Sequence, residues 1–201
     1  MTLPAGYFED LYASKEDPWG FRDRWYESRK REVTLASLPH RRYRRAFEAG
    51  CSIGLVTSAL AARCDQLLAV DASEAAVARA RQQVAAHRHV HVERRMLPGE
   101  WPAGEFDLVV LSEVGYYLDA DDLDVLIDRA ISGLAAGGVL LACHWRHPVA
   151  DYPQSGDAVH RAIRERTALA RAVFHEETDF LLEVFTHGRQ PSVAEDEGLV
   201  T

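Results

Sequence analysis

A glycine turn between a predicted strand and a predicted helix decides the fold: residues 46–54 read AFEAGCSIG. Residues 43–48 before the turn are typical of a strand, and the Ala-rich segment 55–63 after it is typical of a helix. The same alternation continues along the chain. Further strands are predicted at 66–70, 90–94, 106–112 and 139–143, and further helices at 25–38, 74–86, 123–134 and 157–167.

Strands that alternate with helices of this length predict βαβ units and therefore a parallel sheet. We expect an open, doubly wound α/β fold whose ligand lies at the carboxyl ends of the strands. Segments 172–176 and 180–186 predict a late hairpin, so the sheet is expected to be mixed, with an antiparallel end.

The chain is expected to form one domain over residues 1–201, because no repeat and no Pro-, Gly- or Ser-rich linker divides it. Residues 1–40 are expected to form a helical cover with a break at Asp17–Gly20. Residues 41–188 are expected to form the core, and the polar residues 189–201 a frayed tail.

The composition excludes several classes of protein. The 201 residues carry 23 Lys and Arg against 31 Asp and Glu, a net charge of −8, which argues against a nucleic-acid binder. No apolar run approaches the roughly 18 residues of a membrane span, and the first residues lack the basic start and apolar segment of a secretory signal. Cys51, Cys64 and Cys143 lack the spacing of a disulfide frame or a zinc site, so we expect a cytoplasmic protein without a bound metal.

The turn does not fit the dinucleotide-binding motif or the P-loop. It matches the sequence of one catalytic motif but not the structural context which that motif requires. The dinucleotide motif G-x-G-x-x-G needs glycine at positions 50, 52 and 55, and only Gly50 is present; the Gly-Lys-Ser/Thr of a P-loop is absent. Residues 50–54 match G-x-S-x-G, the nucleophile elbow of α/β-hydrolases. That elbow needs an earlier strand with an oxyanion loop, which the helical segment before residue 38 does not offer, so we interpret the match as accidental.

A fourth interpretation of the turn explains more residues. An acidic residue at the end of the first strand, with glycines two and six positions later, is the pattern of the S-adenosylmethionine loop of class I methyltransferases. Gly50 and Gly54 would let the backbone approach the ligand, and the helix N-terminus favours its carboxylate, while Glu48 is expected to hold its ammonium. Asp71 ends the second strand, and its paired acceptor oxygens suit the two ribose hydroxyls.

With these residues the chain resembles class I methyltransferases and, more closely, the nodulation-protein NodS-like branch, over about residues 7–185. The motifs that carry the resemblance are DPW at 17–19, WYE at 25–27, FEAGCSIG at 47–54, VD at 70–71 and LSEVGYYL at 111–118. The resemblance implies a Rossmann-like sheet of seven strands with the last antiparallel, S-adenosylmethionine as cofactor, and methyl transfer to an amine. NodS itself N-methylates a deacetylated chitin oligosaccharide.

Two positions depart from the family pattern. Ser52 stands where the middle of the loop usually has glycine, and its small side chain is expected to preserve cofactor binding. No acidic residue follows the third strand, so Met96 and Leu97 are expected to hold the adenine through apolar contact and backbone N–H groups. The remaining expected cofactor-binding residues are Trp19, Tyr26, Ala72 and Ser112. The first two are expected to close over the cofactor as a lid, with core packing as the alternative.

Three residues are candidates for the chemistry. Glu113 ends the fourth strand, where it could hold an acceptor amine and accept its proton; the alternative is an ion pair with the basic segment Arg22–Arg45. Tyr117, beside Tyr116, is expected to flank the sulfonium or orient the amine, with packing as the alternative. His144 ends the fifth strand and is the candidate base, although a histidine at a strand end is more often structural.

Together these residues predict an S-adenosylmethionine-dependent methyltransferase that N-methylates an amine of a small molecule, such as an amino sugar or an oligosaccharide. A small-molecule O-methyltransferase and a methyltransferase-like protein that binds without catalysis stay open as alternatives. No nucleic-acid or membrane partner is expected.

Overall fold

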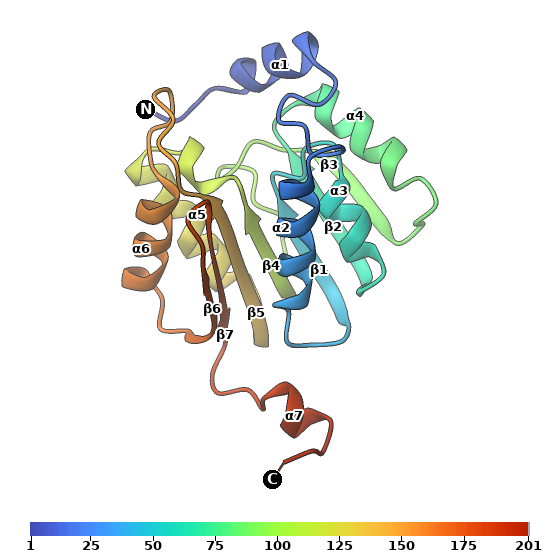
Figure 1. The fold of residues 1–201 in the computed structure, drawn as a ribbon, viewed down its shortest axis with the longest axis vertical. Coiled ribbons are helices and arrows are strands. Elements are labelled where there is room, and N and C mark those ends of the chain that lie inside the picture. The colour runs from blue at the N-terminus through green and yellow to red at the C-terminus, as the bar shows by residue number, and fades with distance from the viewer. Residues whose placement is uncertain (201) are drawn as a thin grey trace.

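The computed structural model describes residues 1–200 and shows a seven-stranded sheet in the order β3-β2-β1-β4-β5-β7-β6 (Figure 1). The strands are β1 (Tyr43–Ala49), β2 (Cys64–Asp71), β3 (Val90–Arg94), β4 (Phe106–Ser112), β5 (Leu134–Trp145), β6 (Ala170–Glu176) and β7 (Phe180–Thr186). Strands β1 to β5 pair in parallel, whereas β7 runs antiparallel to both β5 and β6. The expected sheet of seven strands with the last antiparallel is therefore confirmed.

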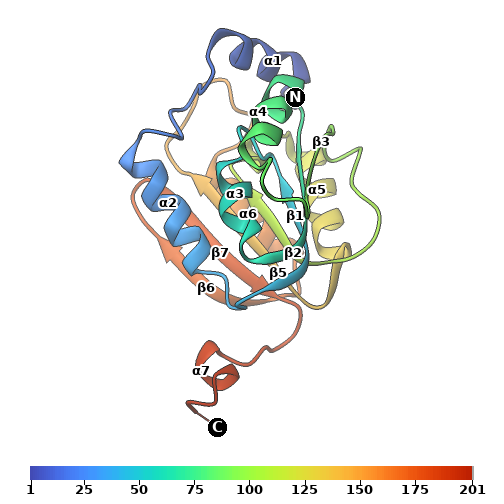
Figure 2. The same cartoon turned by 90° about the vertical axis from the view of Figure 1, so that its right-hand side faces the viewer.

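Helices cover both faces of the sheet, as a doubly wound fold requires (Figures 1 and 2). One face carries α2 (Trp25–Ala36), α3 (Leu55–Ala61) and α4 (Glu74–Gln83), and the other carries α5 (Ala120–Ser132) and α6 (Gly156–Arg166). On β4, Leu108 and Val110 pack into the cluster that contains α3. Val109 and Leu111 pack into the cluster that contains α5 and α6. This burial on two sides explains why β4 is apolar nearly throughout.

The helix α1 (Ala5–Ser14) lies over the carboxyl ends of the strands, at the top of Figure 1. Glu9 fastens it to the first turn of α4 by accepting hydrogen bonds from Ser73 Oγ at 2.9 Å and from the next backbone N–H at 2.5 Å. Arg79 of α4 fastens the other end by donating to the Tyr12 carbonyl at 2.9 Å. The expected N-terminal helical cover is therefore present and is held at two points.

The boundary between α5 and β5 differs from the prediction. Helix α5 ends at Ser132, and β5 begins at Leu134 rather than at Val139. A shift in the register between β4 and β5 accommodates the extra residues. Gly137–Gly138, which the sequence suggested as the helix stop, therefore lie inside the strand.

The tail also differs from the prediction, because part of it is helical. The short helix α7 (Val193–Asp196) is capped by Ser192, whose Oγ accepts the Glu195 N–H at 3.2 Å. The polar composition suggested fraying, but the Ser-x-x-Glu spacing is that of a capping box.

Candidate active site

The turn after β1 adopts left-handed backbone at alternate positions: φ is 73° at Gly50, 51° at Ser52 and 82° at Gly54. Glycine suits the first and last of these, where a Cβ would meet Val114 at 3.3 Å or Ala80 at 2.9 Å. Ser52 is the exception, because left-handed backbone costs a residue with a side chain roughly 1–2 kcal/mol.

Ser52 is held in this conformation by two contacts. Its backbone N–H donates to Asp71 Oδ2 at 2.8 Å, and its hydroxyl shares a hydrogen bond with the Tyr12 hydroxyl at 2.5 Å. Tyr12 comes from α1 and is buried. The serine therefore links the turn to the N-terminal cover, which a glycine could not do.

A cavity of about 390 Å³ lies between this turn, the cover and the end of β4. The expected site residues that line it are Trp19, Tyr26, Gly50, Ser52, Asp71, Ala72, Met96, Leu97, Glu113 and Tyr117. Lining residues that the sequence did not single out for a role in the site include Tyr12, Glu27, Lys30, Trp145 and Tyr152. These reach the cavity from helices and loops whose docking onto the sheet is not visible in a local pattern.

Glu48 and Ser112 line a smaller cavity instead, of about 60 Å³. It shares six lining residues with the larger cavity: Phe21, Glu27, Lys30, Gly50, Ser52 and Glu113. Glu48 is 2% exposed, and within residues 1–200 its Oε2 has no hydrogen-bond partner. Burial raises the pKa of Glu48 to about 8, and the neighbouring Thr57 hydroxyl opposes this effect only in part. A buried carboxyl oxygen without a hydrogen-bond partner in residues 1–200 fits an ammonium group supplied by a ligand. Gly54 lines neither cavity and serves the close packing of the turn on α4.

Asp71 lines the larger cavity at the end of β2. Its Oδ1 accepts the Ser73 N–H at 3.0 Å, and its Oδ2 accepts the Ser52 N–H at 2.8 Å. Burial raises the pKa of Asp71, and these backbone donors oppose that effect. Because each carboxylate oxygen has a second lone pair, both oxygens can still accept one hydroxyl of a ribose.

Glu113 stands directly after β4 with a φ of 56°, and its carboxylate receives three donors. Lys30 Nζ lies 2.9 Å from Oε1, while the Tyr116 hydroxyl and the Trp145 N–H donate to Oε2. The same Lys30 Nζ lies 3.0 Å from Glu27 Oε2. Lys30 belongs to the basic segment of the cover, so the alternative expectation for Glu113, an ion pair with that segment, is what the structure shows.

In the cluster of Glu27, Lys30 and Glu113, the lysine is buried, the two glutamates are partly buried, and acidic groups outnumber basic ones. Burial lowers the pKa of Lys30, but the two neighbouring carboxylates outweigh this effect and raise it, so the ammonium stays charged. Burial raises the pKa of Glu27, against the opposing effects of Lys30 and, more weakly, of Arg24. Two carboxyl groups therefore face one ammonium, and the cluster favours a further cation.

Aromatic rings form the wall of the cavity beside this cluster. Tyr116 stacks on Tyr152 with 5.0 Å between ring centroids, and Tyr117 meets these two rings edge-on at 4.7 and 4.8 Å. Trp145 contacts Tyr26 edge-on at 5.3 Å. The rings both line the cavity and pack on one another, so the two roles expected for such residues apply together.

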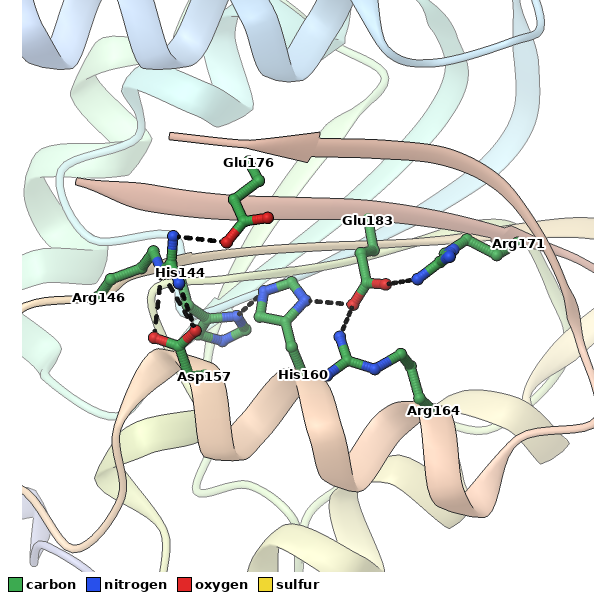
Figure 3. Close-up of polar contacts among 8 residues, drawn as sticks. All are labelled: His144, Arg146, Asp157, His160, Arg164, Arg171, Glu176 and Glu183. Atoms are coloured by element: carbon green, nitrogen blue, oxygen red, sulfur yellow. Dashed lines mark hydrogen bonds and ion pairs between the residues drawn. The ribbon is translucent and has the colours of Figure 1, made fainter. Parts of the chain in front are cut away.

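His144 lines neither cavity. It is 0% exposed near the end of β5, where Nε2 accepts the Gly115 N–H at 3.2 Å and Nδ1 faces His160 Nε2 at 3.2 Å (Figure 3). Burial lowers the pKa of His144 well below its usual value. The expected role of a base in contact with the acceptor is therefore not supported, because the imidazole is enclosed by protein.

Within residues 1–200, no three His, Cys, Asp or Glu side chains are grouped so that they could hold a metal ion. In the same part of the chain, no helix has both the length and the apolar character that a membrane span requires. The three cysteines are free and buried.

A doubly wound sheet with β7 reversed, a glycine turn after β1 and carboxylates at the ends of β1 and β2 define the class I S-adenosylmethionine-dependent methyltransferase fold. Residues 9–152 match the family described as Nodulation protein S (NodS). This match spans more than half of the chain, so the chain belongs to the NodS family.

Curated relatives carry the same name. Nodulation protein S of Rhizobium tropici is 29% identical over 130 residues, which is 63% of this chain and 54% of the relative. Nodulation protein S of Sinorhizobium fredii is 31% identical over 125 residues, which is 61% of this chain and 58% of the relative. The chain thus spans little more than half the length of the curated relatives it matches.

The similar solved structures include two that match over most of the chain. A candidate methyltransferase from Pseudomonas syringae is 49% identical, with a TM-score of 0.73, and covers 81% of this chain and 99% of its own. The N-methyltransferase NodS from Bradyrhizobium japonicum WM9, in complex with S-adenosylhomocysteine, is 25% identical, with a TM-score of 0.83. That match covers 93% of this chain and 100% of the other. The bound product of the relative agrees with S-adenosylmethionine as the cofactor.

Proposed function

We propose that this protein transfers a methyl group from S-adenosylmethionine to an amine of a small molecule, such as an amino sugar. The observation that carries the proposal is the cluster of Glu27, Lys30 and Glu113, which lines the same cavity as Gly50 and Asp71. Two carboxyl groups against one ammonium favour a cationic acceptor. The NodS relative from Bradyrhizobium japonicum WM9 is an N-methyltransferase, which supports transfer to nitrogen.

The residues around the turn fit the cofactor. When bound, S-adenosylmethionine supplies an electrophilic methyl group on a positively charged sulfur. Glu48 would hold its ammonium, because the buried Oε2 lacks a partner within residues 1–200. Asp71 would hold the ribose hydroxyls with its remaining lone pairs, and Met96 and Leu97 supply apolar wall for the adenine.

The acceptor amine must lose a proton before it can react, because an ammonium has no lone pair. A carboxylate within hydrogen-bond reach is the group that can take this proton. Glu113 already receives three donors, whereas Glu27 is paired with Lys30. Burial raises the pKa of Glu27, which brings it closer to the pKa of an effective base at neutral pH. In this proposal the one acceptor position left on the Glu113 carboxylate holds the amine, and Glu27 receives its proton.

Transfer to a hydroxyl is the second candidate. The Tyr26 hydroxyl favours it, because this group is buried at the cavity wall and has no hydrogen-bond partner in the described part of the chain. A hydroxyl acceptor would need a stronger base, and His144, the candidate base, lines neither cavity. Transfer to an amine is therefore the better supported reaction.

Calorimetric titration with S-adenosylhomocysteine tests the cofactor half of the proposal. We expect binding to the wild type and binding weaker by roughly tenfold or more in Asp71→Ala, because the ribose loses hydrogen bonds to a charged group. Asp65→Ala is the matched control, since Asp65 lies on the same strand and lines neither cavity. Absence of binding, or equal affinity in Asp71→Ala, would contradict the assignment.

Methyl-transfer assays with amino sugars and their N-acetylated counterparts test the acceptor half. We expect transfer only where the amine is free, and a kcat lower by roughly a hundredfold in Glu27→Gln, within the range for loss of a general base. Transfer to hydroxyl groups alone would favour the second candidate. Cofactor binding without turnover on either kind of acceptor would favour a protein that binds without catalysis.

A further inference from the structure

A buried row of hydrogen-bonded side chains joins three elements of the fold, β5, α6 and β7 (Figure 3). Its members are His144 on β5, His160 on α6 and Glu183 on β7, and each is 0% exposed. Nδ1 of His144 lies 3.2 Å from Nε2 of His160, and Nδ1 of His160 lies 2.8 Å from Glu183 Oε2. Arg164 and Arg171 close the row by donating to the two Glu183 oxygens at 2.9 Å each.

The direction of every hydrogen bond follows from the two ends of the row. The Gly115 N–H can only donate, so Nε2 of His144 accepts and the proton of the neutral ring lies on Nδ1. Burial raises the pKa of Glu183, but the hydrogen bond from His160 and the arginines outweigh it and lower the pKa below its usual value. The ionised Glu183 can only accept, so Nδ1 of His160 donates to it and Nε2 accepts from His144. The Gly115 N–H at one end and the Glu183 carboxylate at the other therefore require the same arrangement, with the proton on Nδ1 of both His144 and His160.

The row of hydrogen bonds ends at Gly115, in the turn after β4 whose residues Val114, Tyr116 and Tyr117 line the larger cavity. A Cβ at Gly115 would meet Val159 Cγ1 at 2.6 Å and His144 Nε2 at 3.2 Å, so the backbone here is pressed onto α6. The His144 ring also contacts the Tyr116 ring edge-on at 5.5 Å. Tyr116 in turn donates to Glu113, so the support given by His144 reaches the carboxylate that binds Lys30.

We propose that His160 and Glu183 are positioning residues for the acceptor side of the site. They fix the tautomer of His144, so that its Nε2 lone pair accepts the hydrogen bond from the Gly115 N–H. This bond holds the segment that carries Glu113 and Tyr116 in place at the cavity. With the proton on Nε2, the His144 N–H would face the Gly115 N–H in a buried place, and two buried donors would lack an acceptor, which costs free energy. The effect on turnover rests on the proposed methyl transfer, whereas the effect on the turn does not.

The first test needs no substitution and no acceptor. Nitrogen-15 spectra of the imidazole side chains report which ring nitrogen carries the proton. In the wild type at neutral pH we expect His144 and His160 to carry it on Nδ1, with Nε2 as acceptor. A proton on Nε2 of His144 would overturn the proposal.

The second test compares His160→Leu with His160→Gln by amide hydrogen exchange at Gly115. Leucine removes both hydrogen bonds, whereas glutamine keeps an acceptor for His144 and a donor for Glu183. We expect exchange at Gly115, relative to the core amides of β4, to be faster by roughly tenfold in His160→Leu and close to the wild-type rate in His160→Gln.

Val184→Ala is the control, because Val184 is 0% exposed on β7 and makes none of these polar contacts. It should destabilise the protein without a selective change at Gly115. Unchanged exchange at Gly115 in His160→Leu, or the same selective change in Val184→Ala, would overturn the proposal.

Turnover gives the last readout. We expect His160→Leu to lower kcat/KM for an amine acceptor by roughly tenfold while the Kd for S-adenosylhomocysteine stays unchanged, because Gly50 and Asp71 lie outside the chain of hydrogen bonds. An equal loss of cofactor affinity would point to general damage and overturn the assignment. If the tautomers and the Gly115 exchange rates are as expected but the protein methylates no amine, the positioning role is supported and the proposed function is refuted.

Discussion

Replacing Glu113 by glutamine keeps the shape of the side chain but removes the charge that Lys30 faces at 2.9 Å. Removing one partner of a buried ion pair costs about 3–5 kcal/mol. Here the cost is expected to be smaller, because Lys30 keeps Glu27 at 3.0 Å. We therefore expect Glu113→Gln to lower the free energy of unfolding by about 2 kcal/mol, the contribution of one charged hydrogen bond.

A double-mutant cycle isolates the contact itself. Lys30→Met removes the ammonium but keeps an apolar stem, and it leaves Glu27 and Glu113 without their shared cation. We expect it to cost about 3 kcal/mol. In Lys30→Met/Glu113→Gln the two losses should overlap by about 1.5 kcal/mol, because both single variants remove the same contact. Urea denaturation at pH 7, followed by tryptophan fluorescence, measures all three variants.

Arg42 and Asp65 form the matched control, since their ion pair lies on the surface with side-chain exposures of 55% and 52%. The side chains of Lys30 and Glu113 are only 9% and 16% exposed. The cycle with Arg42→Met and Asp65→Asn should give a coupling below about 1 kcal/mol that falls in high salt. Additive losses at Lys30 and Glu113, within about 0.5 kcal/mol, would refute the argument that this pair is buried and coupled.

Two further predictions concern the cofactor side. The pKa of Glu48 in the folded protein, about 8, lies above its unfolded value of about 4.3, so the unfolded state ionises first and wild-type stability falls as pH rises from 5 to 8. Urea titrations should show the wild type losing a few kcal/mol relative to Glu48→Gln over this range, and parallel pH profiles would contradict the effect of burial. Tyr12→Phe removes the hydroxyl bonded to Ser52 and should weaken S-adenosylhomocysteine binding by roughly fivefold, about 1 kcal/mol, in calorimetry. Tyr7→Phe, on the same helix but outside the cavity, should leave the affinity unchanged. Equal affinities in the two variants would contradict a role of the Tyr12–Ser52 hydrogen bond in cofactor binding.

Local patterns were sufficient for most of the strands. The predicted ranges 90–94, 106–112 and 180–186 coincide with β3, β4 and β7, because apolar runs bounded by turns depend on neighbouring residues only. The prediction failed at the start of β5, where Gly137–Gly138 look like a helix stop. The pairing with β4 decided that boundary, and pairing between strands is not a local property.

The sequence by itself determined the turn at Gly50–Gly54 and the placement of Glu48 and Asp71 at strand ends. Spacing within one strand–turn–helix unit is enough for both, since parallel strands bring their carboxyl ends to one edge. The sequence did not determine what these side chains contact. Only the tertiary structure showed that Glu48 Oε2 is enclosed without a hydrogen-bond partner in the described part of the chain, while Asp71 faces the larger cavity.

The partners of Glu113 and His144 were decided by the tertiary structure alone. Lys30 and Glu113 are 83 positions apart, and they meet because α2 packs over the end of β4. His144 was a candidate base by its position at a strand end, yet α6 and β7 enclose it with His160 and Glu183. A strand end specifies where a side chain lies on the sheet, whereas the packing of distant elements decides whether that side chain meets a ligand or another buried residue.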